Sequence, residues 1–385
     1  MPVAGGSTGW GELPVAPAAR AGELVFASAQ TGITADGAGG VRAQAERALE
    51  ELEAALAQAG ARADEVIDVV SFHADVNEIT DVLDVARRRL GSPLPPWTPV
   101  SSTEPGPSGA RVALKAVAHL GDGPRELFTP DSIRWWRRLP IAAGVRKGDH
   151  LFVAGQLGSD ADGYVNTPGD HGGQARNALN RVAEICRAAG GGPEDVIDLT
   201  SFHQDPRGIE PSAVVVGGEI FDSEGERPAW TAAGVPGLLR FGMLGQYRAL
   251  AVLSGDRRVA AGAGCAPWPS GSGPAAVAKA GASLVAVAGQ VAVDGRGRTV
   301  GRGDPAEQAR ACVERMRDAL EAAGGSMSAL VELVCLHKDR RSPAAVLEAL
   351  GEELEPGSGP AWSAAGVTGL WDEDHLHAVH GLAVI

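Results

Sequence analysis

Apolar residues recur every three to four positions in three stretches of the chain, a spacing that predicts amphipathic helices. In the first stretch Ala48, Leu52, Ala55 and Leu56 fall on one helical face, and the closing glycine suits a C-terminal cap. All three stretches begin with Gln-Ala, end with Ala-Gly and have the same length, at 44–60, 174–190 and 308–324. Each is therefore predicted to be a helix that packs with one face on a sheet.

Apolar, β-branched runs of strand character follow the predicted helices at a constant distance. They read EVIDVVSFH, DVIDLTSFH and ALVELVCLH, and each ends on a histidine 13 residues after the glycine of its helix: His73, His203 and His337. Another strand, which ends in a turn with Gln30, Gln156 or Gln290, precedes each helix. After the histidine come a further helix-length segment, a turn with Trp97, Trp230 or Trp362, and a closing strand.

The chain thus contains one unit three times, and 385 residues divide into three units of about 128, an ordinary domain size. Each unit is predicted to be an α+β layer with its helices on one face of the sheet. We expect repeats at 1–120, 132–253 and 275–385. The Gly-, Pro- and Ser-rich stretches between them, 121–131 and 254–274, are predicted to be linkers.

Composition restricts the kinds of partner and cofactor that the protein is expected to bind. The net charge of −14 argues against nucleic acid, because binding to a polyanion depends on concentrated Lys and Arg. No apolar run is long enough to span a membrane and no signal peptide begins the chain, so we expect a cytoplasmic protein. The four cysteines, Cys186, Cys265, Cys312 and Cys335, show no disulfide or zinc spacing. No motif for a cofactor is present, since the glycines at 294–303 lack the order of a nucleotide-binding loop.

The order of these motifs resembles the RidA/YjgF family: a strand with a Gly-Gln turn, the Gln-Ala to Ala-Gly helix, the strand that ends in Phe-His, the Pro-Ala-x-Ser/Thr turn and the closing strand. The resemblance covers almost the whole chain three times. Members of that family have a chorismate-mutase-like fold and are typically homotrimers with small-molecule clefts between subunits. It therefore implies an intramolecular pseudo-trimer, monomeric as a protein, with three sheets inside, helices outside and three unlike clefts.

Two family signatures are changed. Members that hydrolyse enamines or imines carry an Arg in the Pro-Ala-x turn, where this chain has Trp97, Trp230 and Trp362. They also carry a Glu on the closing strand, at a position that aligns with Ala113, Gln246 and Ala378. The chain is therefore not expected to be a standard 2-aminoacrylate deaminase.

A His and Trp pattern takes the place of those signatures. His73, His203 and His337 are candidate general acids or bases, and the three tryptophans are candidate pocket walls for a planar ligand. The alternative is that both residue types are packing residues at the interfaces between repeats. The repetition is compatible with either interpretation.

Differences between the repeats suggest further candidates. Arg240, Gln246 and Arg248 of repeat 2 could hold a carboxylate or carbonyl oxygen, the alternative being a solvated strand edge. Repeat 3 ends in WDEDHLHAVHGLAVI, in which His375 and His377 share a strand face and His380 takes the other, so no three-ligand metal site is predicted. Cys335 lies two residues before His337 and shares its strand face, so the two could form a catalytic dyad. The alternative is that Cys335 is a small packing residue at the position that Ser71 and Ser201 occupy in the other repeats.

The leading interpretation is an enzyme of secondary metabolism, without cofactor or metal, that acts on a small-molecule substrate in a cleft between repeats. Its chemistry would be general acid–base catalysis on an imine, enamine or enol-type intermediate: hydrolysis, tautomerisation or cyclising condensation. One alternative is chorismatase-like cleavage of an enolpyruvyl ether. The other is a protein that binds a metabolite or a partner without turnover.

Overall fold

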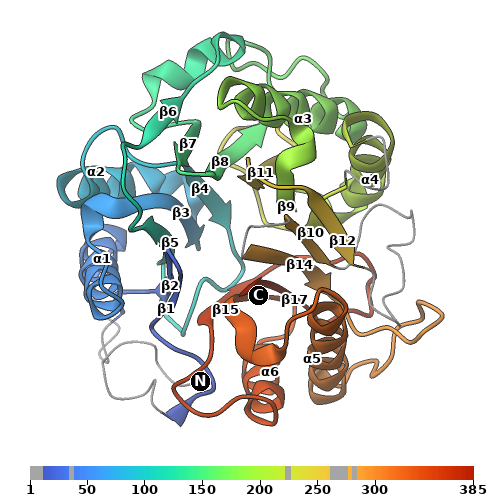
Figure 1. The fold of residues 1–385 in the computed structure, drawn as a ribbon. Helices are drawn as coiled ribbons and strands as arrows, with labels where there is room; N and C mark the ends of the chain where they lie inside the picture. Colours follow the sequence, from blue (N-terminus) through green and yellow to red (C-terminus); the bar gives the residue numbers. More distant parts are fainter. Residues whose placement is uncertain (1–11, 34–38, 222–226, 261–275, 280–283) are drawn as a thin grey trace.

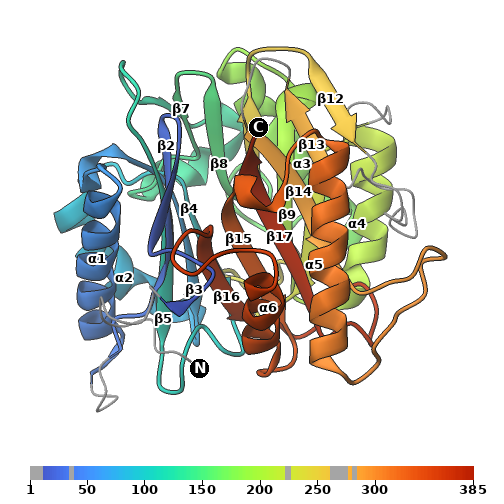
Figure 2. The ribbon, with the colours of Figure 1, turned by 60° about the horizontal axis from the view of Figure 1, so that its bottom comes forward.

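Three similar units surround a common axis in the computed structural model, which describes residues 12–33, 39–221, 227–260, 276–279 and 284–385. Each unit is one mixed sheet with helices on its outer face, and the three sheets turn their other faces toward one another (Figure 1). Viewed from the side, α1 and α5 flank the strands that lie between them (Figure 2). The predicted α+β fold, with sheets inside and helices outside, is confirmed.

The long amphipathic helices form where the apolar spacing predicts them. They are α1 (Val41–Gln58), α3 (His171–Ala188) and α5 (Pro305–Ala322). Shorter helices follow the histidine-ending strands: α2 (Ile79–Leu90), α4 (Ile209–Val215), which continues as a π-helical turn, Val216–Ile220, and α6 (Ser342–Gly351). Among the described residues no helix is long and apolar enough to cross a membrane.

The strands repeat in the same order in each sheet. Repeat 1 has β1 (Ala18–Ala21), β2 (Leu24–Gln30), β3 (Val66–His73), β4 (Trp97–Ser101) and β5 (Val112–His119), in the order β1-β2-β5-β3-β4. Repeat 2 has β7 (Gly144–Lys147), β8 (His150–Leu157), β9 (Val196–His203), β10 (Ala229–Gly234) and β11 (Gly245–Val252). Repeat 3 has β13 (Ala276–Lys279), β14 (Leu284–Gln290), β15 (Leu330–His337), β16 (Ala361–Gly366) and β17 (His377–Val384).

The two stretches predicted as linkers also contribute strands. β6 (Glu126–Phe128) pairs with β7, and β12 (Arg257–Ala260) pairs with β13, so each extends the sheet of the repeat that follows it. Gly and Pro interrupt regular structure in both stretches, but the few residues between them are enough to form one edge strand. Residues 261–274 of the second predicted linker, with Cys265, lie outside the described residues.

The faces of the sheets that point toward the axis share their apolar cores. One shared cluster includes Phe26 and Phe152 from repeats 1 and 2 and Leu284 from repeat 3. A second includes the residue before the motif histidine of each repeat: Phe72, Phe202 and Leu336. Because each inner sheet face is covered by the other two, a repeat separated from its neighbours would expose this apolar surface to water.

Hydroxyl side chains join the sheets at the three seams. Thr98 Oγ1 on β4 accepts a hydrogen bond from Gly155 N of repeat 2 at 3.0 Å. Thr231 Oγ1 on β10 accepts one from Gly289 N of repeat 3 at 2.9 Å. At the third seam the corresponding strand, β16, supplies the donor instead of the acceptor. The backbone N of Trp362 donates to Ser28 Oγ of repeat 1 at 2.7 Å.

Buried acid–base pairs cross all three seams near the axis. They join Lys115 Nζ to Glu332 Oε1 at 2.7 Å, Arg248 Nη2 to Asp68 Oδ2 at 2.7 Å, and His380 Nε2 to Asp198 Oδ1 at 2.9 Å. All six side chains are buried. The acids occupy the same position on β3, β9 and β15, and the bases the same position on β5, β11 and β17. We call these six residues the axial ring; each of its pairs joins two different repeats.

The intact chain is expected to be a monomer, because each repeat already finds in the same chain the two neighbours that cover its inner face. Light scattering coupled to gel filtration should give the mass of one chain, 39.3 kDa. A mass of three chains at micromolar concentration would contradict this prediction.

Candidate functional site

In repeats 1 and 2 the motif histidine, a serine and the tryptophan form a hydrogen-bonded chain. Ser71 Oγ lies 2.7 Å from His73 Nε2 and accepts a bond from Trp97 Nε1 at 2.8 Å. Alternate residues of a strand share a face, which places Ser71 beside His73, and β4 runs parallel to β3 and brings in Trp97. Repeat 2 repeats the arrangement with His203, Ser201 and Trp230 at 2.9 Å for both contacts.

These two chains of hydrogen bonds lie in the core between sheet and helices. His73, His203 and Trp230 are 0% exposed and Trp97 is 1% exposed. Burial lowers the pKa of His73 to about 4 and that of His203 to about 3. Both imidazoles are therefore neutral at neutral pH and enclosed by apolar side chains. In these two repeats the His and Trp side chains thus pack between sheet and helices, and not at the interfaces between repeats where the packing alternative placed them.

Repeat 3 departs from this arrangement. Cys335 occupies the position of the serines, fully buried, and Trp362 and His337 are 9% and 3% exposed. Burial raises the pKa of the Cys335 thiol. Because the thiolate is the nucleophile, a thiol held protonated in the core is a poor partner for His337 in a catalytic dyad.

Of the other histidines of repeat 3, His377 and His380 lie on opposite faces of β17, as strand alternation predicts, whereas His375 precedes the strand and does not share a strand face with His377. His377 pairs with His337 across the strands, and burial lowers the pKa of both His375 and His377 to about 4. His380 faces the axis, where it contacts Asp198. Among the described residues no group of three His, Cys, Asp or Glu is arranged to hold a metal ion.

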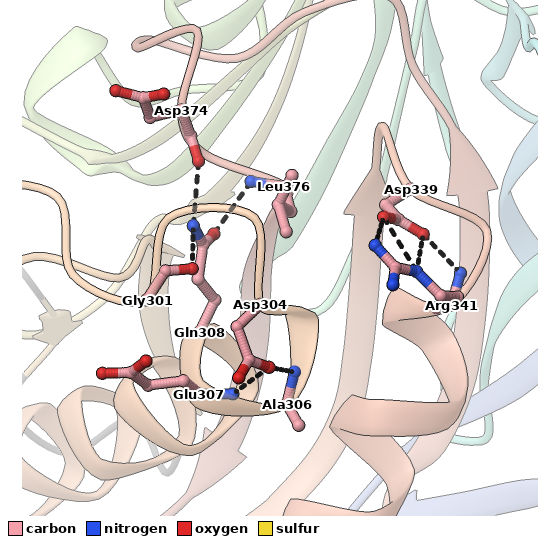
Figure 3. A network of polar contacts seen from close by, with 9 residues as sticks. All are labelled: Gly301, Asp304, Ala306, Glu307, Gln308, Asp339, Arg341, Asp374 and Leu376. Atoms are coloured by element: carbon pink, nitrogen blue, oxygen red, sulfur yellow. Dashed lines mark hydrogen bonds and ion pairs between the residues drawn. The ribbon is translucent and has the colours of Figure 1, made fainter.

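The first glutamine of each Gln-Ala helix has a structural role that the sequence pattern did not reveal. Gln308 Nε2 donates to Asp374 O at 2.8 Å, and Gln308 Oε1 accepts from Leu376 N at 2.8 Å, so the amide fixes the loop before the closing strand (Figure 3). Gln44 and Gln174 make the equivalent contacts in repeats 1 and 2. The sequence did contain a signal, since a glutamine in the same place in all three repeats has a donor NH2 group and an acceptor oxygen to satisfy.

The three substrate-binding candidates of repeat 2 are not brought together. Arg248 belongs to the axial ring and pairs with Asp68. Gln246 is 2% exposed and packs against Gly155, where a Cβ atom would lie 2.7 Å from its amide. Arg240 lies over the ring of Trp135, 4.8 Å from its centroid, in a cation–π contact.

A groove of about 500 Å³ lies between repeats 2 and 3, just beyond the ends of β9 and β15. Its lining comes from both repeats: Pro206, Arg207, Ile209, Glu210, Lys338, Thr368, Gly369, Leu370, Trp371 and Glu373. A volume of this size suits a small molecule, since ligand pockets typically enclose ~300–1,000 Å³. None of the sequence-predicted site residues lines it.

Backbone pairing between the two repeats forms the floor of the groove. Gly234 N donates to Gly369 O at 2.8 Å, and Thr368 N donates to Gly234 O at 2.9 Å. Both glycines lie against Pro206, and a Cβ atom on Gly369 would be 2.3 Å from its ring. The close approach therefore requires glycine at that position.

Two cations and an indole surround the groove. Lys338 Nζ donates to Glu373 O, and Arg207 is held by both carboxylate oxygens of Asp205. Trp371 presents a half-buried indole. Such a set can attract a carboxylate and stack on a planar ligand, while Glu210 and Glu373 are available for proton transfer.

Comparison with known proteins accounts for the threefold architecture. The family described as Endoribonuclease L-PSP matches the chain three times, at residues 14–120, 139–252 and 273–385. The chain belongs to this family. The match confirms three fused repeats of the RidA/YjgF kind, the resemblance that the sequence motifs indicated.

Individual proteins are similar to one repeat or to most of this family member. The RutC family protein YjgH of Escherichia coli (strain K12) is 44% identical over 100 residues, which are 26% of this chain and 74% of that protein. A solved structure of protein YJGH is 36% identical, covers 34% of this chain and 96% of its own, and has a TM-score of 0.29. A solved chorismatase covers 83% of this chain and 93% of its own with a TM-score of 0.55; at 16% identity this shows a shared fold alone.

The stability of this family member should depend on pH through its buried histidines. A group whose folded-state pKa is depressed contributes stability above its unfolded pKa, ~6.5 for His, and that contribution is lost as the pH falls toward the folded value. Below about pH 6.5 the unfolding free energy should therefore fall by ~1.4 kcal/mol per pH unit for each such histidine. The unfolding free energy, measured in urea from pH 7 to pH 4.5, should change less steeply with pH for His203→Gln than for the parent chain. The same pH dependence in both would show that folding does not lower the pKa of His203.

Proposed function

We propose that this chain binds a small planar carboxylate in the groove between repeats 2 and 3 and acts on it by general acid–base chemistry. The observation that carries the proposal is the groove itself, about 500 Å³ in volume, with Arg207, Lys338 and Trp371 on its walls. Relatives with the family's usual site place small molecules between neighbouring units, and this groove also lies between two units.

The reaction class follows from the groups near the groove. Arg207 and Lys338 would hold the carboxylate, and Trp371 would stack on the unsaturated part of the substrate. Glu210 or Glu373 would then exchange a proton with a carbon next to a carbonyl or imine, which is the step shared by enol and enamine tautomerisation. The motif histidines are buried and do not line the groove, so we do not assign the proton transfer to them.

Two other activities receive less support. The family description names endoribonuclease activity, but a net charge of −14 disfavours RNA as a substrate. The chorismatase shares only the fold at 16% identity. Binding without turnover remains the alternative to the proposed reaction, and it is supported by the absence of an exposed imidazole among the three motif histidines.

Ligand binding can be tested with benzoate, phenylpyruvate and chorismate. Calorimetric titration should detect binding of at least one of these carboxylates to the intact chain. Arg207→Ala and Lys338→Met should each weaken it about tenfold, or ~1.4 kcal/mol, because each removes one cation from the groove. Arg341→Ala is the matched control, since Arg341 is held by Asp339 as Arg207 is by Asp205 and does not line the groove (Figure 3).

The same panel separates the possible activities. Enol-to-keto conversion of phenylpyruvate, faster with the parent chain than with Glu210→Gln and Glu373→Gln, would support the proposed chemistry. Release of pyruvate from chorismate would favour the chorismatase alternative, and binding without any product would favour sequestration. If none of the carboxylates binds, or if the Arg207 and Lys338 variants bind as the parent chain does, the groove is not the site.

A further inference from the structure

A second, much smaller cavity lies near the axis, enclosed by all three repeats. Its volume is about 20 Å³. Ten residues line it: Val70, Phe72, Lys115, Thr200, Phe202, Thr231, Arg248, Val334, Leu336 and His380. One base of the axial ring from each repeat is therefore present, and none of the three carboxylates is.

The position of the carboxylates gives the cavity an uneven charge. Each acid contacts its base from outside the lining, as in the 2.7 Å contact between Glu332 and Lys115. Arg248 lies 2.7 Å from Asp68 and 3.9 Å from Asp198. Lys115, Arg248 and His380 thus occupy the side of the ring that faces the cavity, so an occupant would meet N–H groups rather than carboxylate oxygens.

Hydrogen-bond donors remain available around this space. Arg248 Nε and Thr200 Oγ1 are buried and have no hydrogen-bond partner among the described residues. Thr231 Oγ1 accepts a bond from Gly289 N, which leaves its own hydrogen free to be donated. An unsatisfied buried donor costs ~1–3 kcal/mol, so an occupant that accepts these hydrogens would be stabilising.

We propose that this cavity binds a single monatomic anion of the halide class, such as chloride. A volume of ~10–15 Å³ already accommodates one water-sized species, so about 20 Å³ leaves no room for phosphate, sulfate or a carboxylate. A water molecule would need acceptors for its own hydrogens, and the hydroxyls of Thr200 and Thr231 can accept them, whereas Lys115 and Arg248 have donors alone, which suit an anion better. The apolar side chains Val70, Phe72, Phe202, Val334 and Leu336 complete the lining, and a weakly hydrated halide tolerates such neighbours.

The charge balance of the ring is compatible with such an anion. Three bases face three acids, so full ionisation leaves the ring neutral. Asp68 is the acid least suited to ionisation, because burial raises its pKa despite the nearby Arg248 and Lys115. A proton on Asp68 would leave Arg248 without its full counter-charge, which an anion in the cavity would supply.

Bromide can test the proposal directly on the intact chain. Crystals grown without halide and soaked in sodium bromide should show an anomalous difference peak at the bromine edge inside the cavity, beside Lys115 and Arg248. A cavity without an anomalous peak, whether it contains a water molecule or nothing, would overturn the proposal.

A solution measurement complements the crystal. In the low-millimolar range, below the concentrations at which sulfate stabilises proteins by exclusion from their surface, the melting temperature of the parent chain should rise more with sodium chloride than with sodium sulfate at equal ionic strength. Lys115→Met combined with Glu332→Gln removes one cation together with its acid, and should abolish the chloride-specific rise. Arg341→Ala, on the outer surface, should retain it. If the double variant does not fold, the bromide experiment on the parent chain decides alone, and an equal response to both salts in the parent chain contradicts a chloride site.

Discussion

The architecture depends on the three acid–base pairs that cross the seams near the axis. Each is buried, so each side chain has lost its hydration and relies on a partner from another repeat. Removing one partner of such a pair is strongly destabilising, by ~3–5 kcal/mol, because a lone charge remains in the core. Replacing both by apolar residues can be neutral, because the cost of dehydrating two charges offsets much of their attraction.

The three pairs also differ from one another. Lys115 contacts Glu332, Arg248 contacts Asp68 and His380 contacts Asp198, so the three seams are chemically distinct. In an assembly of identical subunits all three pairs would have to be the same. Fusion into one chain removed that requirement, and the seams could then diverge, as the exchanged donor and acceptor at Ser28 and Trp362 also show.

Much of the fold could be predicted from the sequence because its periodicities are strong and occur three times. The helices at α1, α3 and α5 and the strands that end in His73, His203 and His337 lie where apolar spacing indicates. Strand alternation also correctly placed His73 on the same face as Ser71, and His380 opposite His377. The edge strands β6 and β12 were missed because a short segment between glycines and prolines has no detectable period.

The candidate site was harder to predict than the fold, because strand alternation shows which residues share a face but not what that face contacts. The face that carries His73 and Trp97 packs against helices, whereas a cleft between repeats was one of the two interpretations. Each histidine-ending strand has a single acidic residue among apolar ones, and the sequence shows it: Asp68, Asp198 and Glu332. Their partners could not be predicted, because they lie more than 100 positions away in the chain. The groove is formed by loops from two repeats, and no local pattern links Arg207 to Lys338.

The central claim is that the three repeats form one cooperative unit. Equilibrium unfolding of the intact chain in urea, followed by far-ultraviolet circular dichroism and by tryptophan fluorescence, tests it most directly, since the eight tryptophans include one buried residue of the motif in each repeat: Trp97, Trp230 and Trp362. The shared inner cores and the axial ring predict a single transition with coincident midpoints for both probes. Two or three separate transitions would contradict it, because they would show that a repeat can unfold while its neighbours remain folded.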